Sequence, residues 1–256
     1  MFSERNIEFS IHPDLIDIKN IQPIPTKKSL PDWYKKIQKH TIHSHNLKGC
    51  MPFLDVISAG YLLPLPQDLY IGHNILNKTV EPPQKTCIYK FAFSENISND
   101  RCNMYNLNGQ IGQDHHVDQI GGENTFLAKK NGNNHIIKIL NPWRIKTPPG
   151  YSCLFISPTY SENDYFDIIS AIVDTDTFDL HVNFPLIVNN DKYDTFEKVF
   201  QQGTPYVQII PFKRDSWSHK IISKKENNEN IKFRLGYFGK VLDKYKYKIW
   251  NRKVWK

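Results

Sequence analysis

The sequence predicts a mainly β fold, in which short strands form a barrel or a sandwich. Five short runs rich in β-branched and aromatic residues support this: 136–140, 151–157, 168–174, 180–188 and 206–212. Turn clusters such as Pro148-Pro149-Gly150 and Asn189-Asn190-Asp191 separate them. Short strands at this spacing favour a barrel or sandwich over βαβ units. The 13% content of aromatic residues excludes a chain that is disordered throughout.

The first half of the chain shows weaker patterns. Residues 7–11 alternate as a short strand would, and residues 31–37 are typical of a short amphipathic helix that begins at a proline. The segment 94–134 is rich in Asn, Gly and Asp, which indicates long loops or an insertion. We expect three parts: an N-terminal extension over 1–50, a β domain over 51–212 with an insertion near 94–134, and a tail over 213–256.

Composition also bounds the compartment. No apolar run approaches the length of about 20 residues that a membrane helix needs, and the first ten residues lack an apolar signal segment. Four cysteines lie far apart without a CxxC pair, which predicts reduced thiols and neither a disulfide framework nor a zinc site. We therefore expect a protein that is not secreted and does not enter a membrane.

The positive charge is concentrated in the tail. The whole chain carries a formal charge of +7, whereas Lys213 to Lys256 alone hold 14 Lys or Arg against 4 Asp or Glu. Basic and aromatic residues alternate in this stretch, and those proposed for partner binding are Lys244, Lys246, Lys248, Trp250, Arg252 and Trp255. Such a stretch could follow a nucleic-acid backbone and stack on bases, or dock on an acidic protein. The alternative is a helix, expected within 240–256, that packs on its own domain.

Several short motifs follow one another in the predicted β domain. They are Ser58-Ala59-Gly60-Tyr61-Leu62, Pro149-Gly150-Tyr151, Leu154 to Pro158, Ala171 to Phe178, and Gly203 to Ile210. In order and spacing they resemble the motifs of the dUTPase and dCTP deaminase superfamily, over roughly residues 55–65 and 135–212. The resemblance implies a distorted β-barrel of the β-clip type, and a homo-oligomer, possibly a trimer, with sites formed between subunits.

Several chemically important positions depart from that superfamily. Leu62 stands where the superfamily has an aspartate, Thr159-Tyr160 where it has Arg-Ser, and Pro205 where it has an arginine. The glycine-rich phosphate arm is represented only by Arg234, Gly236 and Gly239. Because arginine forks and backbone N–H groups normally hold phosphate charge, these departures weaken the expectation of catalysis.

The resemblance nevertheless assigns candidate site residues. Asp174 and Asp176 stand where the superfamily places a water-activating carboxylate, which acts with Mg²⁺ on the triphosphate. If the pair lies on a strand, both side chains point to one face; the alternative is that it ends a strand and caps a turn. Gln208, Gly203 and Tyr151 are the candidate ligand-binding residues. No cofactor is expected apart from Mg²⁺ in a hydrolase.

Two other kinds of site fit short patterns. His116-Val117-Asp118 matches half of a non-haem iron triad, with His181 or His219 as the third ligand, although a polar loop explains it more simply. Cys50 and Cys153 could each be a nucleophile, but buried thiols are the default interpretation.

A second resemblance covers the whole chain. The segments Pro31-Asp32-Trp33-Tyr34-Lys35 and Asn141 to Ser152 resemble an uncharacterised family of marine phage proteins. Taken together, these observations favour a non-catalytic phage-type protein that uses its β scaffold for assembly or binding, located in the infected cell or the virion. The alternative is a divergent deoxynucleotide hydrolase or deaminase that uses Asp174 as its base.

Overall fold

The computed structural model describes residues 5–17, 19–41, 46–79, 81–92, 112–114, 119, 125–132, 136–223 and 244–256. It confirms the mainly β prediction, with 34% strand against 18% helix. All strand pairings are antiparallel, and the described strands form four sheets.

The largest sheet has five strands in the order β11-β9-β14-β3-β2. Its members are β11 (Ala171–Val173), β9 (Tyr151–Ile156), β14 (Pro205–Lys213), β3 (Tyr61–Pro64) and β2 (Ile24–Pro25). The central strand β14 pairs with β9 on one side and with β3 on the other. This sheet therefore carries most of the motif residues identified in the sequence.

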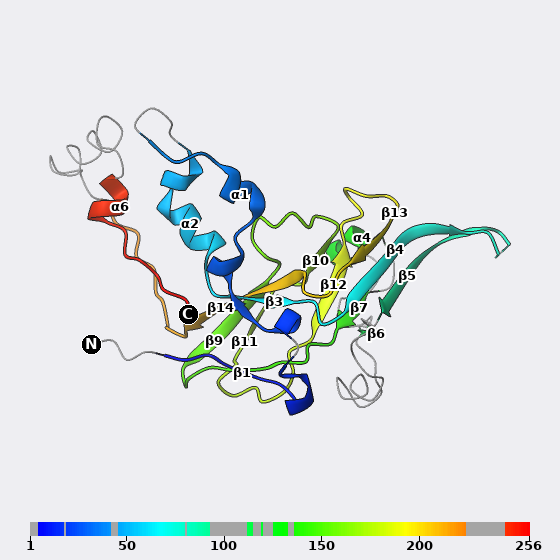
Figure 1. Ribbon diagram of the computed structural model, residues 1–256, viewed down its shortest axis with the longest axis horizontal. Helices are drawn as coiled ribbons and strands as arrows, with labels where there is room; N and C mark the ends of the chain where they lie inside the picture. Colours follow the sequence, from blue (N-terminus) through cyan, green and yellow to red (C-terminus); the bar gives the residue numbers. More distant parts are fainter. Residues whose placement is uncertain are drawn as a thin grey trace.

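The other three sheets are smaller (Figure 1). One joins β10 (Phe166–Ile168), β12 (Phe184–Val188), β7 (Ile137–Ile139) and β6 (Gly112–Asp114) in that order. Another joins β13 (Phe196–Phe200), β4 (Asp68–Asn77) and β5 (Gln84–Ala92), and its β4–β5 hairpin projects to the right in Figure 1. The last pairs β1 (Glu8–Ser10) with β8 (Arg144–Lys146).

The helices are short. They are α1 (Asp32–Lys36), α2 (Met51–Ile57), α4 (Phe126–Lys130) and α6 (Lys244–Lys248), with 3-10 turns at Pro13–Leu15, Lys19–Ile21, Thr26–Ser29 and Leu47–Gly49. Within the part of the chain that is described, no helix has the length and apolar character needed to cross a membrane.

The core lies where the five-stranded and four-stranded sheets meet. Phe184 of β12 packs against Phe155 of β9 and Tyr206 of β14, with ring centroids 5.4 and 5.7 Å apart. Residues of the predicted N-terminal extension also enter this core, since Leu15 and Ile21 are 1% and 0% exposed. Burying a side chain of this size contributes about 1.5–3 kcal/mol. The N-terminal segment therefore stabilises the β domain directly.

The five predicted strand regions all contain strand, with two differences in detail. The run 168–174 is divided between the end of β10 and β11, and 180–188 becomes a strand only at Phe184. The segment 94–134 contributes β6 and α4 within its described residues. The predicted helix over 31–37 is confirmed as α1.

The predicted barrel is not formed, since none of the sheets built from the described strands closes on itself. The edge strands β11 and β2 of the largest sheet are three and two residues long. Neither of these two strands pairs with a further described strand, so the sheet is open at both edges.

Candidate functional site

Asp174 and Asp176 lie in a turn. Strand β11 ends at Val173, and the N–H groups of Thr177 and Phe178 donate to the carbonyl of Asp174. The interpretation that places the pair along a strand is therefore wrong, and the alternative of a turn after a strand holds. The Asp174 side chain is 61% exposed and accepts from the Ser152 hydroxyl at 2.6 Å. The Asp176 side chain is 5% exposed and accepts from the Gly150 N–H at 2.8 Å.

Arg214 binds both carboxylates. Its Nη1 lies 2.7 Å from Asp176 Oδ1 and 3.2 Å from Asp174 Oδ1, and its Nη2 forms an ion pair with Asp176 Oδ2. Hydrogen bonds from Arg214 and from the Gly150 N–H lower the pKa of Asp176 to about 2. Because Asp176 is then too weak a base to take a proton from water near neutral pH, it is unsuited to general-base catalysis.

Arg214 is a site residue that the sequence analysis missed. It was counted only as part of the basic tail, yet it follows directly after β14 and reaches the turn after β11. Its Nη1 also donates to the Tyr151 carbonyl at 3.2 Å and to Ser152 Oγ at 3.1 Å. The cluster therefore ties together the ends of three neighbouring strands.

Gln208 is fully buried in β14, and its amide is saturated with protein partners. Its Oε1 accepts from the N–H and the hydroxyl of Thr159 at 2.9 and 3.0 Å. Its Nε2 donates to the carbonyls of Val56 and Ala59 at 3.2 and 2.9 Å. Gln208 therefore fixes the end of α2 and the loop after β9 to the central strand.

The loop that contains Thr159 and Tyr160 is held by aromatic side chains. The Trp33 indole N–H of α1 donates to the Tyr160 carbonyl at 3.0 Å, and the Tyr160 ring packs against Phe53 with centroids 5.0 Å apart. The positions that would carry phosphate-binding groups thus make internal contacts.

A cavity of about 320 Å³ lies beside Gln208. Its charged lining residues are Asp32, Lys35 and Glu162, and Lys35 forms an ion pair with Asp32 at 2.8 Å. The described lining contains no arginine, and it does not include Asp174 or Asp176. The structure therefore brings Gln208 to a pocket but places the two aspartates elsewhere.

The other two candidate ligand-binding residues have structural environments. Gly203 has φ +88°, which a glycine adopts without strain, and its N–H donates to the Leu65 carbonyl at 3.0 Å. The Arg5 guanidinium lies 4.9 Å from the centre of the Tyr151 ring, whose buried hydroxyl finds no hydrogen-bond partner among the residues that the structure describes. Neither residue lines the cavity beside Gln208.

The metal and thiol hypotheses gain little support. His116 and Asp118 lie outside the described residues, whereas His181 Nδ1 is 2.9 Å from the Asn141 carbonyl. Among the residues that the structure places, no three His, Cys, Asp or Glu side chains gather as a metal site. Cys153 is buried, and burial raises the pKa of its thiol to about 11. Cys50 is exposed.

A partly buried cluster of Cys87, His73 and Asn190 was also missed. Cys87 Sγ of β5 lies 3.5 Å from His73 Nδ1 of β4, and His73 Nε2 lies 3.0 Å from Asn190 Oδ1. Burial lowers the pKa of His73 and raises the pKa of Cys87, so both groups are neutral near neutral pH. His73 lies in the irregular stretch of β4 between Gly72 and Ile75. The cluster therefore stabilises this irregularity and lacks the ion pair of an activated thiol.

The described part of the tail folds back on its own chain. The Trp250 indole N–H and the Lys253 ammonium both donate to Asp55 Oδ2 of α2, at 2.9 and 2.7 Å. Trp255 packs edge-on against Tyr61 of β3, with ring centroids 6.2 Å apart.

Helix α6 spans only Lys244–Lys248, so the helix expected over 240–256 is shorter than predicted. Residues 250–256 instead follow the extended path that these contacts require.

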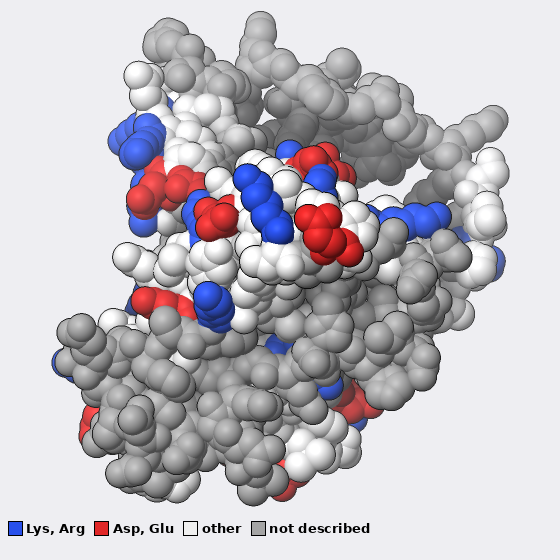
Figure 2. All heavy atoms as spheres, turned by 90° about the vertical axis from the view of Figure 1, so that its right-hand side faces the viewer, with Lys and Arg blue, Asp and Glu red and all other residues white. Residues whose placement is uncertain are grey.

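The tail cations differ in exposure. Lys248 and Arg252 are exposed, Lys246 is half-buried, and the backbone of Lys244 begins α6. On the face shown in Figure 2, Lys and Arg alternate with Asp and Glu over the described residues. The described residues of that face thus form no continuous positive track of the kind that binds a nucleic-acid backbone, and α6 and the C-terminus lie on the opposite side of the molecule, at the left of Figure 1.

No family model matches the chain, and no curated protein matches it. The resemblance to the dUTPase and dCTP deaminase superfamily therefore stays a prediction. The contacts of this chain's own residues are the basis for the proposals below.

Proposed function

We propose that this chain is a non-catalytic, phage-type assembly protein that self-associates, built on a dUTPase-like β scaffold. The supporting observation is the segment 214–223, which follows β14 without helix or strand. Three large apolar side chains in it, Trp217, Ile221 and Ile222, are 90%, 91% and 65% exposed. We call this segment the exposed arm. The resemblance to the phage family places its action in the infected cell or the virion, and the resemblance to the dUTPase superfamily makes a trimer the expected oligomer.

Exposure of this kind favours a partner surface. Single exposed apolar residues are normal, but several on one short segment mark an interaction site. Aromatic side chains also act as anchors in interfaces, because they bury much area at a low cost in conformational entropy. A second copy of this chain is the partner that we propose, with Trp217 as the anchor.

The motif residues support the non-catalytic part of the proposal. Asp176 is neutralised by Arg214, and every hydrogen-bonding group of the Gln208 amide is occupied within the chain. Enzymes of this kind need donors that are positioned for developing phosphate charge, a contribution of several kcal/mol. Here the corresponding positions hold the fold together.

The test is the molar mass of the purified full-length protein by light scattering during size-exclusion chromatography. We expect a homo-oligomer that dissociates on Trp217→Ser with Ile221→Ser. The matched control is Phe126→Ser, which removes an exposed apolar side chain (78%) from α4 instead. A wild-type monomer at micromolar concentration would refute the proposal.

One observation favours the hydrolase alternative. The Asp174 carboxylate is 61% exposed and could reach a bound water, whereas Mg²⁺ would be carried mainly by the phosphates of the substrate. Pyrophosphate release from dUTP or dCTP with Mg²⁺ is the test. Brisk release that Asp174→Asn abolishes would establish this alternative, and its absence supports the assembly function.

We also propose that the tail meets an acidic protein or nucleic acid through its exposed cations, Lys248 and Arg252. Trp250 and Trp255 are less available, because they contact α2 and β3. Nucleic-acid retention by full-length and tail-deleted protein should differ at low salt. The log of the affinity should then fall by about 0.9 per phosphate contact per log unit of salt.

A further inference from the structure

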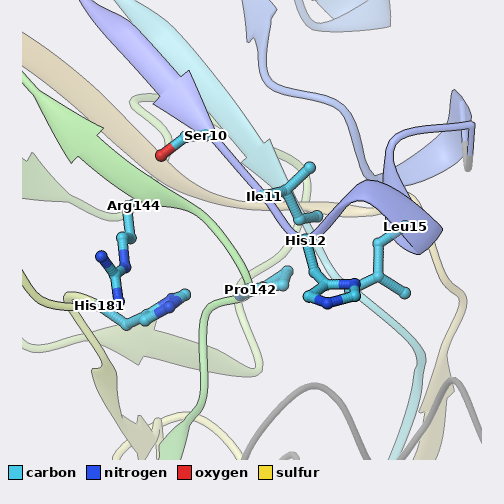
Figure 3. A pocket seen from close by; sticks show the side chains of 7 residues that line it. All are labelled: Ser10, Ile11, His12, Leu15, Pro142, Arg144 and His181. Carbon is cyan, nitrogen blue, oxygen red and sulfur yellow. The ribbon is translucent and has the colours of Figure 1, made fainter.

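A second pocket, of about 330 Å³, lies where the N-terminal strand meets the turn before β8. Its lining residues are Ser10, Ile11, His12, Leu15, Pro142, Arg144 and His181. In Figure 3, Arg144 and His181 lie together on one side, and His12 lies on the other side beyond Pro142. The pocket is separate from the cavity beside Gln208 and shares no lining residue with it.

Three of these residues form a row across neighbouring strands. Ser10 of β1 is directly opposite Arg144 of β8, and Arg144 is in turn opposite His181 in an isolated antiparallel bridge. Directly opposite residues project from the same face of a sheet. Ser10 and Arg144 are exposed, so a hydroxyl, a guanidinium and an imidazole stand side by side on the outer face.

The row is unbalanced in charge. The described lining of the pocket contains no Asp or Glu. The Arg144 guanidinium forms no hydrogen bond or ion pair with any residue that the structure describes, and the acid on β1, Glu8, is opposite Lys146. A guanidinium carries five N–H donors in a planar fork, which matches the oxygens of an oxyanion.

The turn that carries Arg144 is rigidly held. The Asn141 side chain bonds to both the carbonyl and the N–H of Trp143, at 2.8 and 3.1 Å, and the Trp143 indole donates to the Ile21 carbonyl at 2.9 Å. Both side chains are buried. The site is therefore preorganised, which reduces the entropy lost on binding.

The same turn orients His181. Because a carbonyl only accepts, His181 Nδ1 donates its hydrogen to the Asn141 carbonyl at 2.9 Å. This hydrogen bond fixes the ring and leaves Nε2 available for a ligand. The segment Asn141 to Arg144, which was singled out by its sequence, thus positions both nitrogen-bearing side chains of the row.

From this geometry we propose that the pocket binds the phosphate group of a small phosphomonoester. The Arg144 fork donates to two phosphate oxygens and the Ser10 hydroxyl donates to a third, whereas His181 Nε2, an acceptor while Nδ1 carries the ring hydrogen, accepts from the P–OH of the phosphate monoanion. Ile11, Leu15 and Pro142 provide an apolar wall for the organic part of the ligand. The volume, near the lower end for small-molecule sites, suits a compact ligand rather than a polymer. This proposal is independent of self-association through the exposed arm.

Titration calorimetry of the full-length protein with inorganic phosphate and with phenyl phosphate tests the site. We expect both to bind, phenyl phosphate more tightly because its ring meets the apolar wall. Arg144→Gln should weaken binding by about tenfold or more, since charge-assisted hydrogen bonds are lost. Arg144→Lys, which keeps the charge but not the fork, should bind at an intermediate level.

The matched control is Lys78→Gln, an equal change of charge at an exposed residue just after β4, which should leave phosphate affinity unchanged. Thermal melting of each variant checks that it is folded, as expected for substitutions at exposed positions. Absence of phosphate binding, or equal binding by wild type and Arg144→Gln, would overturn the proposal. So would tight binding of a short single-stranded oligonucleotide through Arg144 without binding of phenyl phosphate.

Discussion

Arg214 forms a bidentate ion pair with Asp176, in which each of two guanidinium nitrogens donates to one carboxylate oxygen, although the two residues are 38 positions apart in the chain. The same carboxylate also accepts the N–H of Gly150, in the turn before β9. This relationship turns a candidate catalytic residue into a connection between strands.

The Asp176 ion pair predicts a specific dependence of stability on acid. Its pKa is about 2 in the folded protein, against about 3.9 in an unfolded chain. A lowered pKa stabilises the fold above the unfolded value, and that contribution is lost as the pH falls from about 4 to 2. Thermal melting across this range should show a steeper loss for wild type than for Asp176→Asn.

The control for this experiment is Asp179→Asn, at an exposed position five residues after Asp174 in the same region. It should keep the wild-type slope. An unchanged slope in Asp176→Asn would contradict the assignment of the acid sensitivity to the Arg214 pair.

Gln208→Leu should strongly destabilise the protein. The substitution leaves the Thr159 N–H and the Ala59 carbonyl without the buried partner that they now have, whereas the Val56 carbonyl still accepts from the Ala59 N–H and the Thr159 hydroxyl. Each unsatisfied buried group costs about 1–3 kcal/mol, so we expect a loss of at least about 2 kcal/mol in the free energy of unfolding by urea. Gln201→Leu, at an exposed position, should change it by less than about 0.5 kcal/mol. If Gln208→Leu lowered the free energy of unfolding by less than about 0.5 kcal/mol, water would have to replace the hydrogen bonds of the amide.

Asp55→Ala should release the tail. The Asp55 carboxylate accepts both tail hydrogen bonds on α2, so its removal leaves the contact of Trp255 with Tyr61 as the main anchor. We expect faster tryptic cleavage after Lys248 and Arg252, followed by mass spectrometry. Asp17→Ala, which removes an exposed carboxylate elsewhere, should cleave at the wild-type rate. Equal rates for all three proteins would mean that Asp55 does not hold the tail.

The cysteines should differ in reactivity. Burial raises the pKa of Cys87 and raises that of Cys153 to about 11, which suppresses their thiolates near pH 8, whereas Cys50 is exposed. Iodoacetamide should therefore label Cys50 before it labels Cys87 and Cys153, as measured by peptide mass spectrometry. The Cys50→Ser variant checks the assignment. Faster labelling of Cys87, with loss of that reactivity in His73→Gln, would instead show that the cluster activates its thiol.

Some strands were predictable because their signal is local. The runs around β9, β12 and β14 are dense in apolar and β-branched residues and are bounded by turn residues, so their burial follows from composition alone. Strands β4, β5 and β13 were missed. In β13 three consecutive residues, Glu197, Lys198 and Val199, are exposed, and an irregularity interrupts β4. As a result, neither β13 nor β4 shows the alternation of apolar and polar residues by which a strand is detected in a short stretch of sequence.

The sequence by itself determined the mainly β class and the basic, aromatic character of the tail, because composition and short-range periodicity carry both. The tertiary structure decided which residues meet. Gln208 reaches the Val56 carbonyl across 152 positions, Arg214 reaches Asp176 across 38, and strand register aligns Ser10, Arg144 and His181. Such pairings depend on the register and order of strands. These are set by packing of the whole core and leave no mark at fixed spacing in the chain.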